Sequence, residues 1–591
     1  MKLLKPYGIL WILAAFYILA YLTPLACRPM LRPDEYRYAE IPREMLETGD
    51  WVTPKMLGVR YFEKPAPGYQ LTAVSFSLFG ENAFALRLPS ALASLLTAVL
   101  IFLLARTFSR DRAFAFLSAG IFLTFGLVFG VGTFAVVDMQ LTAALTGAVV
   151  FGFLAWHSRK KLWKEVVFLV CAGVFAGVAF LIKGGLGVVI PAIVLVPFLM
   201  FRREWKRIFI YGVTVLGAAA LVALPWSLAI HEAEPDFWRY FLEEEHWKRF
   251  TSATYDRKPQ PFWYFIPVLF GGMLPAGLLW FAGWTGWKKR FSVSAPLLEK
   301  TRIALRSLLI ESPALSFLFC WFVIPFVFFS ASSCKLGTYI LPCFPPLAML
   351  TADGVCAAFR TNRASAQKWL NGMLRCFGGA ILALSALALS GLVIMKLTDF
   401  LIFGGSFWLQ VTTALLLFAW GCLVWRSAKE KHNLRKMALF LFGITPAVIT
   451  ALASLTPEQF GNRATGDAIR MCLKDMPVNA DDLVLVDRNT ATAAGWVLKR
   501  SDLIVIGRPG EMQYGFLNYP EYASRWYQET DLEQLVRTTP SGKRVWIMIE
   551  RGDPKPLPLR DSGCGDSPCR WRDSRPFLTV TAQAFCLPGV C

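Results

Sequence analysis

Long apolar runs separated by short polar connections occupy the first 455 residues of the chain. A helix needs roughly 20 apolar residues to cross about 30 Å of hydrocarbon, because it rises 1.5 Å per residue. The pattern therefore predicts about thirteen transmembrane helices, near residues 7–25, 85–105, 113–130, 137–156, 165–182, 186–201, 208–230, 262–283, 312–330, 338–358, 373–395, 401–425 and 437–455. The first run is too long for a signal-peptide core and lacks a small-residue cleavage site, which predicts a retained anchor.

Lys and Arg gather in every second connection between these runs. The short basic connections are RTFSRDR, HSRKKLWK, FRREWKR, WKKRFSVSAPLLEKTRIALR, FRTNRASAQKWLNGMLR and WRSAKEKHNLRK. Because basic loops resist translocation, they mark the cytoplasmic side of a membrane. The pattern predicts a multi-pass protein of a bacterial inner (plasma) membrane with a cytoplasmic N-terminus. It places the other loops and the C-terminal segment on the outer face, in the periplasm.

The polar segments divide the chain into two domains. We expect a transmembrane domain at 1–456, with outer loops at 28–84 and 231–261, and a soluble periplasmic domain at 457–591. In the latter, ATGDAIRMCLKDM has helical spacing, and DLVLVD, DLIVIG, RVWIMIE and FLTVTAQ are short strand-like runs. The predicted fold class is a polytopic α-helical membrane protein with a C-terminal extracytoplasmic α/β domain.

The first outer loop is too long and too patterned to be a plain connector. In PDEYRYAEIPREMLETGD, Asp34 can cap a surface helix that ends at Thr48 and Gly49, with Pro42 as a kink or a restart. This helix would have an apolar face (Tyr38, Ile41, Met45) and a solvated, charged one (Arg37, Glu40, Glu44). The apolar segment KPAPGYQLTAVSFSLFG predicts a second surface element.

Two cysteine pairs mark the end of the chain, CGDSPC (Cys564, Cys569) and CLPGVC (Cys586, Cys591). On the oxidising side of the membrane they predict two local disulfides, with a zinc site as the alternative.

Composition supports the membrane assignment, and together with the absent motifs it argues against nucleic acid and nucleotides as ligands. Of the 591 residues, 55% are hydrophobic and 17% are charged, and the mean hydropathy is +0.47. The net charge of +20 falls largely on the cytoplasmic loops, so we expect membrane lipids and no nucleic acid as partners. The sequence contains no phosphate-binding GxxxxGK[ST] loop, no dinucleotide-binding motif, and neither GxSxG nor HExxH. We therefore expect no nucleotide cofactor.

Carboxylates lie at two places on the predicted outer face. Asp34 and Glu35 follow the first span, and Asp138 in GTFAVVDMQLT begins another. Each could serve only as a helix cap or a first-turn acid that the helix dipole favours. If the two places meet in one cavity, they suit acid/base chemistry or the orientation of a cation.

Basic and aromatic residues gather on the same face. Lys64 in YFEKP could bind a phosphate at headgroup level, and Lys183 in FLIKGGLG ends a span, where snorkelling is the alternative. The loop EEEHWKRFTSATYDRKPQ supplies His246, Lys248, Arg249, Arg257 and Lys258 although it lies outside, and SSCKLGTYILP adds Lys335 and Tyr339. This combination indicates a site for an anionic, amphipathic ligand such as a lipid phosphate. Glu63 with His246 could form a sparse metal site.

Six motifs, in this order and spacing, resemble one known family. They are RPDEYRYAEIPREML, GVRYFEKPAPGY, AVVDMQLT, LIKGGLG, EEEHWKRF and KLGTYILPCFPPLAML, and the resemblance covers roughly residues 1–360. The chain resembles the aminoarabinose transferases that modify lipid A. These are polyprenyl-phosphate-sugar glycosyltransferases that share their membrane fold with protein O-mannosyltransferases.

The resemblance implies roles for the residues that match the motifs. The acid at the Asp34 position lies at the catalytic centre, and the one at the Asp138 position supports it. The implied carrier-phosphate ligands are Lys64, Arg249, Tyr339 and Lys183; the implied cavity residues are Glu35, Tyr38 and Tyr61. Glu63 is the implied contact for a divalent metal, zinc, to which His246 could contribute.

The implied reaction moves a sugar, 4-amino-4-deoxy-L-arabinose or a related glycosyl group, from undecaprenyl phosphate to lipid A or another envelope glycan. Direct displacement would invert the anomeric carbon. Two alternatives remain open from the sequence. One is a protein O-glycosyltransferase of the same fold, and the other is a transporter or flippase for an anionic lipid.

Overall fold

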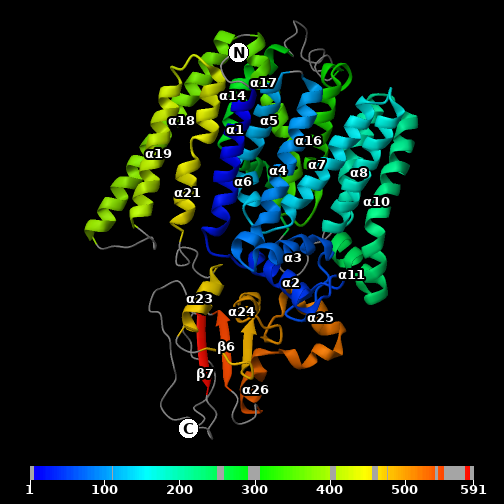
Figure 1. The fold of residues 1–591 in the computed structure, drawn as a ribbon, viewed down its shortest axis with the longest axis vertical. Coiled ribbons are helices and arrows are strands. Elements are labelled where there is room, and N and C mark those ends of the chain that lie inside the picture. Colours follow the sequence, from blue (N-terminus) through cyan, green and yellow to red (C-terminus); the bar gives the residue numbers. More distant parts are fainter. Residues whose placement is uncertain are drawn as a thin grey trace.

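The computed structural model describes residues 6–109, 111–248, 259–290, 306–361, 363–398, 407–455, 463–474, 477–538, 544–550 and 580–585. They form a bundle of long helices with a smaller region around a β-sheet at one end of it (Figure 1). Two helices of the segment 28–84, the predicted first outer loop, lie between the bundle and the sheet: α2 (Asp34–Thr48) and α3 (Pro67–Phe79) (Figure 1). The predicted domain boundary at 456/457 and all four paired cysteines fall outside the described residues.

Nine helical stretches in the described part of the chain are long and apolar enough to cross a membrane. They are α4 (Ala83–Phe108), α7 (Asp138–His157), α8 (Leu162–Lys183), α10 (Trp205–Ala233), α16 (Pro313–Ala331), η7 with α17 (Gly337–Cys343, Phe344–Thr361), α18 (Arg363–Thr398), α19 (Phe407–Ser427) and α20 with α21 (Asn433–Phe442, Thr445–Ala453). Shorter apolar helices occupy the other four predicted runs: α1 (Pro6–Tyr17) with η1 and η2 (Ile18–Leu22, Thr23–Ala26), α5 (Arg112–Thr124), α9 (Leu186–Phe201), and η4 with α13 (Phe262–Tyr264, Phe265–Met273). Each predicted run thus contains an apolar helix, while the count of thirteen crossings stays a prediction.

Two of the predicted spans are broken halfway along their length. The run at 113–130 divides at Phe125 into α5 and α6 (Gly126–Gly132), and the run at 262–283 divides at Leu274, before Pro275. A proline disfavours helical geometry in the residue before it. The two breaks meet, because the Gly126 N–H donates to the Leu274 carbonyl at 2.7 Å. This bond satisfies two of the backbone groups that the broken helices release, as a low-dielectric surrounding requires. The second half of the later run is α14 (Leu279–Arg290).

Parallel strands form the core of the C-terminal region, as the strand-like runs predict. The sheet order is β5-β4-β3-β6-β7. The first four strands in this order run parallel to one another, and β7 runs antiparallel to β6. The strands are β3 (Leu483–Asp487), β4 (Ile504–Ile506), β5 (Trp526–Tyr527), β6 (Val545–Glu550) and β7 (Val580–Phe585). The accompanying helices are α23 (Thr465–Cys472), α24 (Ala491–Leu498), α25 (Gln513–Asn518) and α26 (Leu532–Thr538). The α/β fold class is confirmed.

The first outer loop contains the predicted surface helix, but not with the predicted details. α2 ends as expected at Gly49, which adopts a left-handed conformation with φ of 70°. Pro33, not Asp34, occupies the N-cap position, and the helix continues through Pro42. The short hairpin of β1 (Lys55–Met56) and β2 (Val59–Arg60) connects α2 to α3, which confirms the second surface element.

The prediction of a solvated charged face on α2 is wrong. Arg37, Glu40 and Glu44 are at most 5% exposed. The β1–β2 hairpin and α24 cover this face: a Cβ added to Gly495 of α24 would lie 2.8 Å from the Glu40 carboxylate. The sequence pattern alone gave no sign of this cover, because α24 lies more than 440 residues further along the chain.

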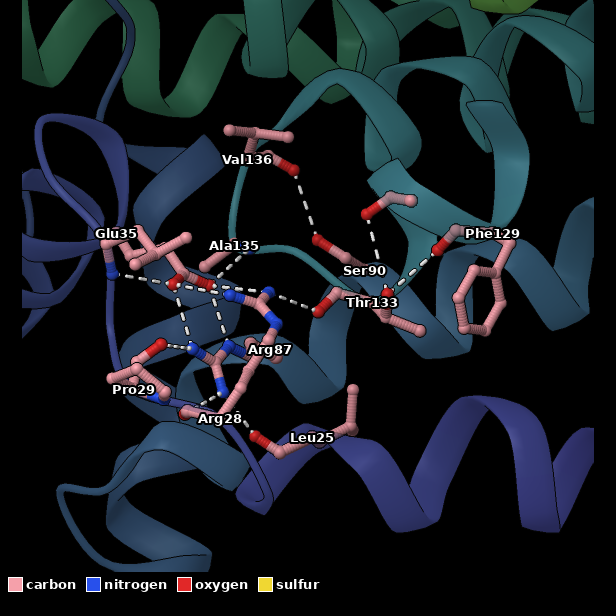
Figure 2. A network of polar contacts seen from close by, with 12 residues as sticks. Leu25, Arg28, Pro29, Glu35, Arg87, Ser90, Phe129, Thr133, Ala135 and Val136 are labelled. Atoms are coloured by element: carbon pink, nitrogen blue, oxygen red, sulfur yellow. Dashed lines mark hydrogen bonds and ion pairs between the residues drawn. The ribbon is translucent and has the colours of Figure 1, made fainter. Parts of the chain in front are cut away.

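A buried carboxylate fixes the beginning of α2 (Figure 2). Glu35 is fully buried and accepts bonds from Arg87 of α4 at 2.7 and 2.8 Å and from Arg28 at 3.1 and 3.2 Å. The backbone N–H groups of Leu31 and Ala135 add bonds of 3.0 and 3.3 Å. Burial by itself would raise the pKa of Glu35, but the two guanidinium groups lower it. The network ties α2 to α4 and to the segment that precedes α7.

Replacement of Arg87 by Met should destabilise the protein. It leaves Glu35 buried without its principal cation, which typically costs roughly 3–5 kcal/mol. Thermal unfolding in detergent measures the effect. The matched control is Arg360→Met, because Arg360 is 63% exposed and its pair with Asp111 spans 3.9 Å. Equal melting temperatures for the two variants would contradict a structural role for the Glu35 network.

A second buried group on α2 predicts a pH dependence of stability. Burial raises the pKa of Glu44 to about 8, and the neighbouring Glu40 carboxylate adds to the effect. Because folding disfavours the ionised form, this residue's contribution to stability is complete below the ordinary carboxyl pKa and is lost as the pH rises through about 8. In Glu44→Gln, the melting temperature should therefore fall less between about pH 5 and about pH 9 than in the unaltered protein. Glu47→Gln, on the same helix with 52% exposure, is the control and should keep the full pH dependence.

Candidate active site

Most of the predicted site residues lie where the first outer loop meets the ends of α7 and α8. Asp34 stands in the first turn of α2, and its side chain is 38% exposed. It forms an ion pair with Arg37, one turn further on, whose side chain is only 6% exposed. The guanidinium also lies over the ring of Tyr38, 5.3 Å from its centroid. Asp34 is thus an accessible carboxylate whose partner is fixed by its surroundings.

A second cluster forms around Asp138, the first residue of α7. One carboxylate oxygen binds the Lys183 ammonium at the end of α8, and the other accepts from the Thr338 hydroxyl at 3.0 Å. The Lys183 ammonium lies 4.7 Å from the ring centroid of Tyr339. The predicted acid Asp138, the predicted base Lys183 and the predicted aromatic residue Tyr339 therefore do meet, although Asp138 and Tyr339 are 201 residues apart in sequence. Asp138 is not the N-cap of α7, because that position is occupied by Val137.

Tyr38 links the two clusters. Its hydroxyl accepts a bond from Lys64, whose ammonium also lies 4.9 Å from the ring centroid. Burial raises the pKa of Tyr38, and the charges of Asp34, Asp138 and Lys183 act on it as well. The Tyr38 hydroxyl is therefore a neutral hydrogen-bonding group that contacts the Lys64 ammonium.

Glu63 and Tyr61 lie beside this group, toward the C-terminal region. The Tyr61 hydroxyl lies 3.0 Å from the Glu63 carboxylate and 3.4 Å from that of Glu511, which follows β4. Glu63 is 7% exposed. It could serve as one ligand of a metal ion, because its carboxylate lies at the wall of a cavity.

His246 packs against the turn that follows Lys183. The Gly185 N–H donates to Nε2 at 3.1 Å, so that Nδ1 carries the proton and donates to the Phe241 carbonyl at 2.8 Å. Gly184 has φ of +68°, and a Cβ there would lie 2.5 Å from Nε2. The imidazole thus supports the turn that positions Lys183. Among the described residues, no three His, Cys, Asp or Glu side chains form a group that could hold a metal.

Two of the remaining predicted residues, Glu35 and Lys335, are held in structural contacts. Glu35 belongs to the buried network that fixes α2. Lys335 donates to the carbonyls of Ser332 and Gln260, the latter at 2.9 Å, and closes the end of α16. Arg249 lies outside the described residues, so its assignment as a phosphate ligand stays a prediction.

A cavity of about 990 Å³ opens beside these clusters, between the first outer loop, α11 (Phe237–Leu242) with η3 (Glu243–Lys248), and the C-terminal region. Its wall includes Arg37 and Glu63 from the first loop. From the sheet region it includes Arg488 and Asn489, after β3, and Glu511, after β4. The carboxyl ends of parallel strands are the usual ligand-binding edge of such sheets. Asp34, Lys64, Asp138 and Lys183 are not among the described residues that line the cavity, which adjoins their clusters through Arg37 and Glu63. Its size and mixed charge suit a polar headgroup.

Sequence reasoning missed three residues of this site. Arg37 was assigned to solvent, although its spacing of three from Asp34 on a helix is the signal of a pair. Thr338 lies next to Tyr339 in the motif KLGTYILPCFPPLAML, and this position was the signal that could have pointed to it. Glu511 has no local signal at all, because it meets Arg37 only through the packing of two domains.

In chemical terms, the site combines one accessible carboxylate with fixed cations. The ammonium groups of Lys64 and Lys183 can bind a phosphate and stabilise the charge that forms on it when a bond to it breaks. Asp34 can accept a proton from a hydroxyl or stabilise positive charge on a carbon atom.

Comparisons with known proteins agree with this chemistry. A family model described as "Dolichyl-phosphate-mannose-protein mannosyltransferase" matches residues 8–241, and one described as "Arabinosyl transferase ArnT, C-terminal domain" matches residues 467–562. The crystal structure of ArnT from Cupriavidus metallidurans bound to undecaprenyl phosphate has the same fold, with a TM-score of 0.72 at 23% identity over 92% of this chain and 93% of that one.

Curated relatives match over nearly the whole chain. The undecaprenyl phosphate-α-4-amino-4-deoxy-L-arabinose arabinosyl transferase 2 of Proteus mirabilis is 36% identical, over 92% of this chain and 94% of its own length. The corresponding transferase of Aeromonas salmonicida is 35% identical, over 93% and 94%. Identity at this level over this length makes the chain a membrane glycosyltransferase and not a transporter. It belongs to the family of undecaprenyl phosphate-α-4-amino-4-deoxy-L-arabinose arabinosyl transferases.

Proposed function

We propose that this protein transfers 4-amino-4-deoxy-L-arabinose from undecaprenyl phosphate to lipid A, or to a related envelope glycan. The relatives bear the name of this donor, and the lipid A acceptor follows from the resemblance of the six motifs. The observation that carries the proposal is the convergence of Lys64, Asp138, Lys183 and Tyr339 around Tyr38, next to the accessible Asp34.

We place the reaction on the periplasmic side of the inner membrane, with the N-terminus in the cytoplasm. The distribution of basic loops supports this orientation. The site lies at the end of the helix bundle that faces the C-terminal sheet (Figure 1). In this orientation the isoprenoid chain of the donor can stay in the bilayer while its phosphate reaches Lys64.

The donor phosphate is the leaving group of the proposed reaction. The acceptor oxygen attacks the anomeric carbon while the bond from that carbon to the phosphate oxygen breaks and its electron pair moves to the phosphate. Lys64 and Lys183 stabilise the resulting charge, and Arg249 is proposed to join them. Attack from the side opposite the phosphate inverts the anomeric carbon.

Asp34 acts at the same anomeric carbon, on the side opposite the phosphate. If the acceptor is a hydroxyl, its proton must leave, and Asp34 is the carboxylate available to take it. If the acceptor is a phosphate, no strong base is needed, and Asp34 orients the sugar or stabilises positive charge at the anomeric carbon. Its pair with Arg37 holds the carboxylate in place in both cases.

We retain Glu63 as the proposed ligand of a divalent metal, zinc. The carboxylate lies at the cavity wall, and a metal there would add positive charge beside the carrier phosphate. His246 can join it only if its Nε2 releases the Gly185 N–H, so Glu63 is the better supported of the two.

Replacement of Asp34 by Asn should lower the transfer rate by about 10²-fold or more, because the side chain keeps its size but loses its charge. Purified protein is incubated with undecaprenyl-phosphate aminoarabinose and either lipid A or a Ser/Thr-containing polypeptide, and the products are identified by mass spectrometry. Glu47→Gln, on the same helix and outside the site, is the control. Equal rates for the Asn variant and the unaltered protein would refute the role of Asp34, and a glycosylated polypeptide would refute the proposed acceptor.

Replacement of Lys64 by Ala should weaken binding of undecaprenyl phosphate by about tenfold or more, since a charged hydrogen bond contributes roughly 1.5–3 kcal/mol. Titration with radiolabelled undecaprenyl phosphate in detergent measures the affinity. Lys55→Ala is the matched control, because Lys55 lies in the same loop and pairs only locally, with Asp50 at 2.9 Å. An unchanged affinity in Lys64→Ala would rule out a phosphate contact.

A further inference from the structure

One carboxylate of the C-terminal region reaches the charged residues of the membrane domain. Glu511 lies in the short helix η9 (Gly510–Met512), which follows β4, and its side chain is 33% exposed at the cavity wall. It forms an ion pair with Arg37, and the Tyr61 hydroxyl lies 3.4 Å from the same oxygen. Glu511 is 474 residues from Arg37 in sequence.

Arg37 is held between two carboxylates. Its Nη2 binds Asp34, and its Nη1 binds Glu511. A guanidinium is a rigid plane, so fixing one of its terminal nitrogens also sets the direction of the other. Because the side chain is 6% exposed, little water is available to replace a lost partner. The orientation of the nitrogen that meets Asp34 therefore depends on Glu511.

We propose that Glu511 is a positioning residue for the transfer reaction. It holds Arg37 so that Asp34 keeps its orientation toward the sugar, and it makes this orientation depend on the docked C-terminal domain. Without Glu511, Asp34 is the one carboxylate left in the ion pairs of Arg37 within the described part of the chain, so the guanidinium can turn toward Asp34 and change the orientation of its carboxylate. This inference rests on the proposed function, because it concerns the same Asp34.

The chain offers a matched control at the same interface. Arg60, in the first outer loop, pairs with Glu521 of the C-terminal region at 2.5 Å, and Glu521 is 51% exposed. Glu521→Gln therefore removes an Arg–Glu pair between the same two parts of the protein, but without a contact to Arg37 or Asp34. If Glu511 only docks the domain, the two substitutions should have similar effects.

We expect Glu511→Gln to lower kcat for sugar transfer by about 10- to 100-fold, with KM for the undecaprenyl-phosphate sugar within about threefold and a nearly unchanged melting temperature. Glu521→Gln should leave kcat unchanged. Glu511→Asp, which keeps the charge, should recover part of the rate. A normal kcat in Glu511→Gln, or an equal loss in both Gln variants, would overturn the inference.

A double-mutant cycle tests whether Glu511 acts through Arg37. Residues that act through one another give non-additive effects. The kcat of the double variant Arg37→Met, Glu511→Gln should therefore be no lower than that of Arg37→Met alone. If the kcat losses of the two single variants multiply in the double variant, the coupling is refuted. This comparison holds even where Glu511→Gln lowers stability. If the unaltered protein transfers no sugar to any acceptor, the proposed function fails and this inference with it. If the unaltered protein and Glu511→Gln transfer sugar at equal rates, only the inference fails.

Discussion

The ion pair between Glu35 and Arg87 is the constraint on which the geometry of the site depends. A carboxylate without exposed surface cannot move away from its cations without a large loss of free energy. The position of Glu35 against α4 therefore fixes both where α2 begins and how it is rotated. Successive residues on a helix point about 100° apart. With Glu35 directed into the bundle, Asp34 is directed away from it, which explains why one of two adjacent acids is buried and the other accessible.

The rest of α2 follows from this rotation. Arg37 lies one turn after Asp34 and reaches both Asp34 and the C-terminal region. Glu40 and Glu44 lie on a third side of the helix, where the β1–β2 hairpin and α24 cover them. Burial raises the pKa of Glu44, and the neighbouring Glu40 carboxylate adds to the effect, which the guanidinium of Arg43 only partly offsets. The helix thus contacts the membrane bundle, the proposed reaction site and the C-terminal region with different faces.

The sequence predicted the features that depend on local pattern. Each of the thirteen predicted runs contains an apolar helix, and the motif residues Asp34, Lys64, Asp138, Lys183 and Tyr339 do lie at one end of the bundle. The pattern failed where distant segments decide the outcome. A charged helical face is typical of a solvated helix, and only the arrival of α24 turns it into an interface. The break at Leu274 does have a local signal in Pro275, but its hydrogen bond to Gly126 has none, because the two residues lie in different predicted spans.

Most of the charged side chains of α2, the helix that follows the first apolar run, are therefore buried in ion pairs and hydrogen bonds. A surface helix held by apolar contacts alone could tilt or rotate, because such contacts have little directional preference. Ion pairs and hydrogen bonds do have a direction, and those of α2 point to three different parts of the protein. The rotation of α2 is fixed from the membrane side by Glu35 and from the β1–β2 hairpin by the Gly58 N–H, which donates to Glu44 at 2.8 Å. From the C-terminal side it is fixed by the pair of Arg37 with Glu511. The carboxylate of Asp34 is thereby held by both domains at once, which ties the geometry of the site to the integrity of their contact.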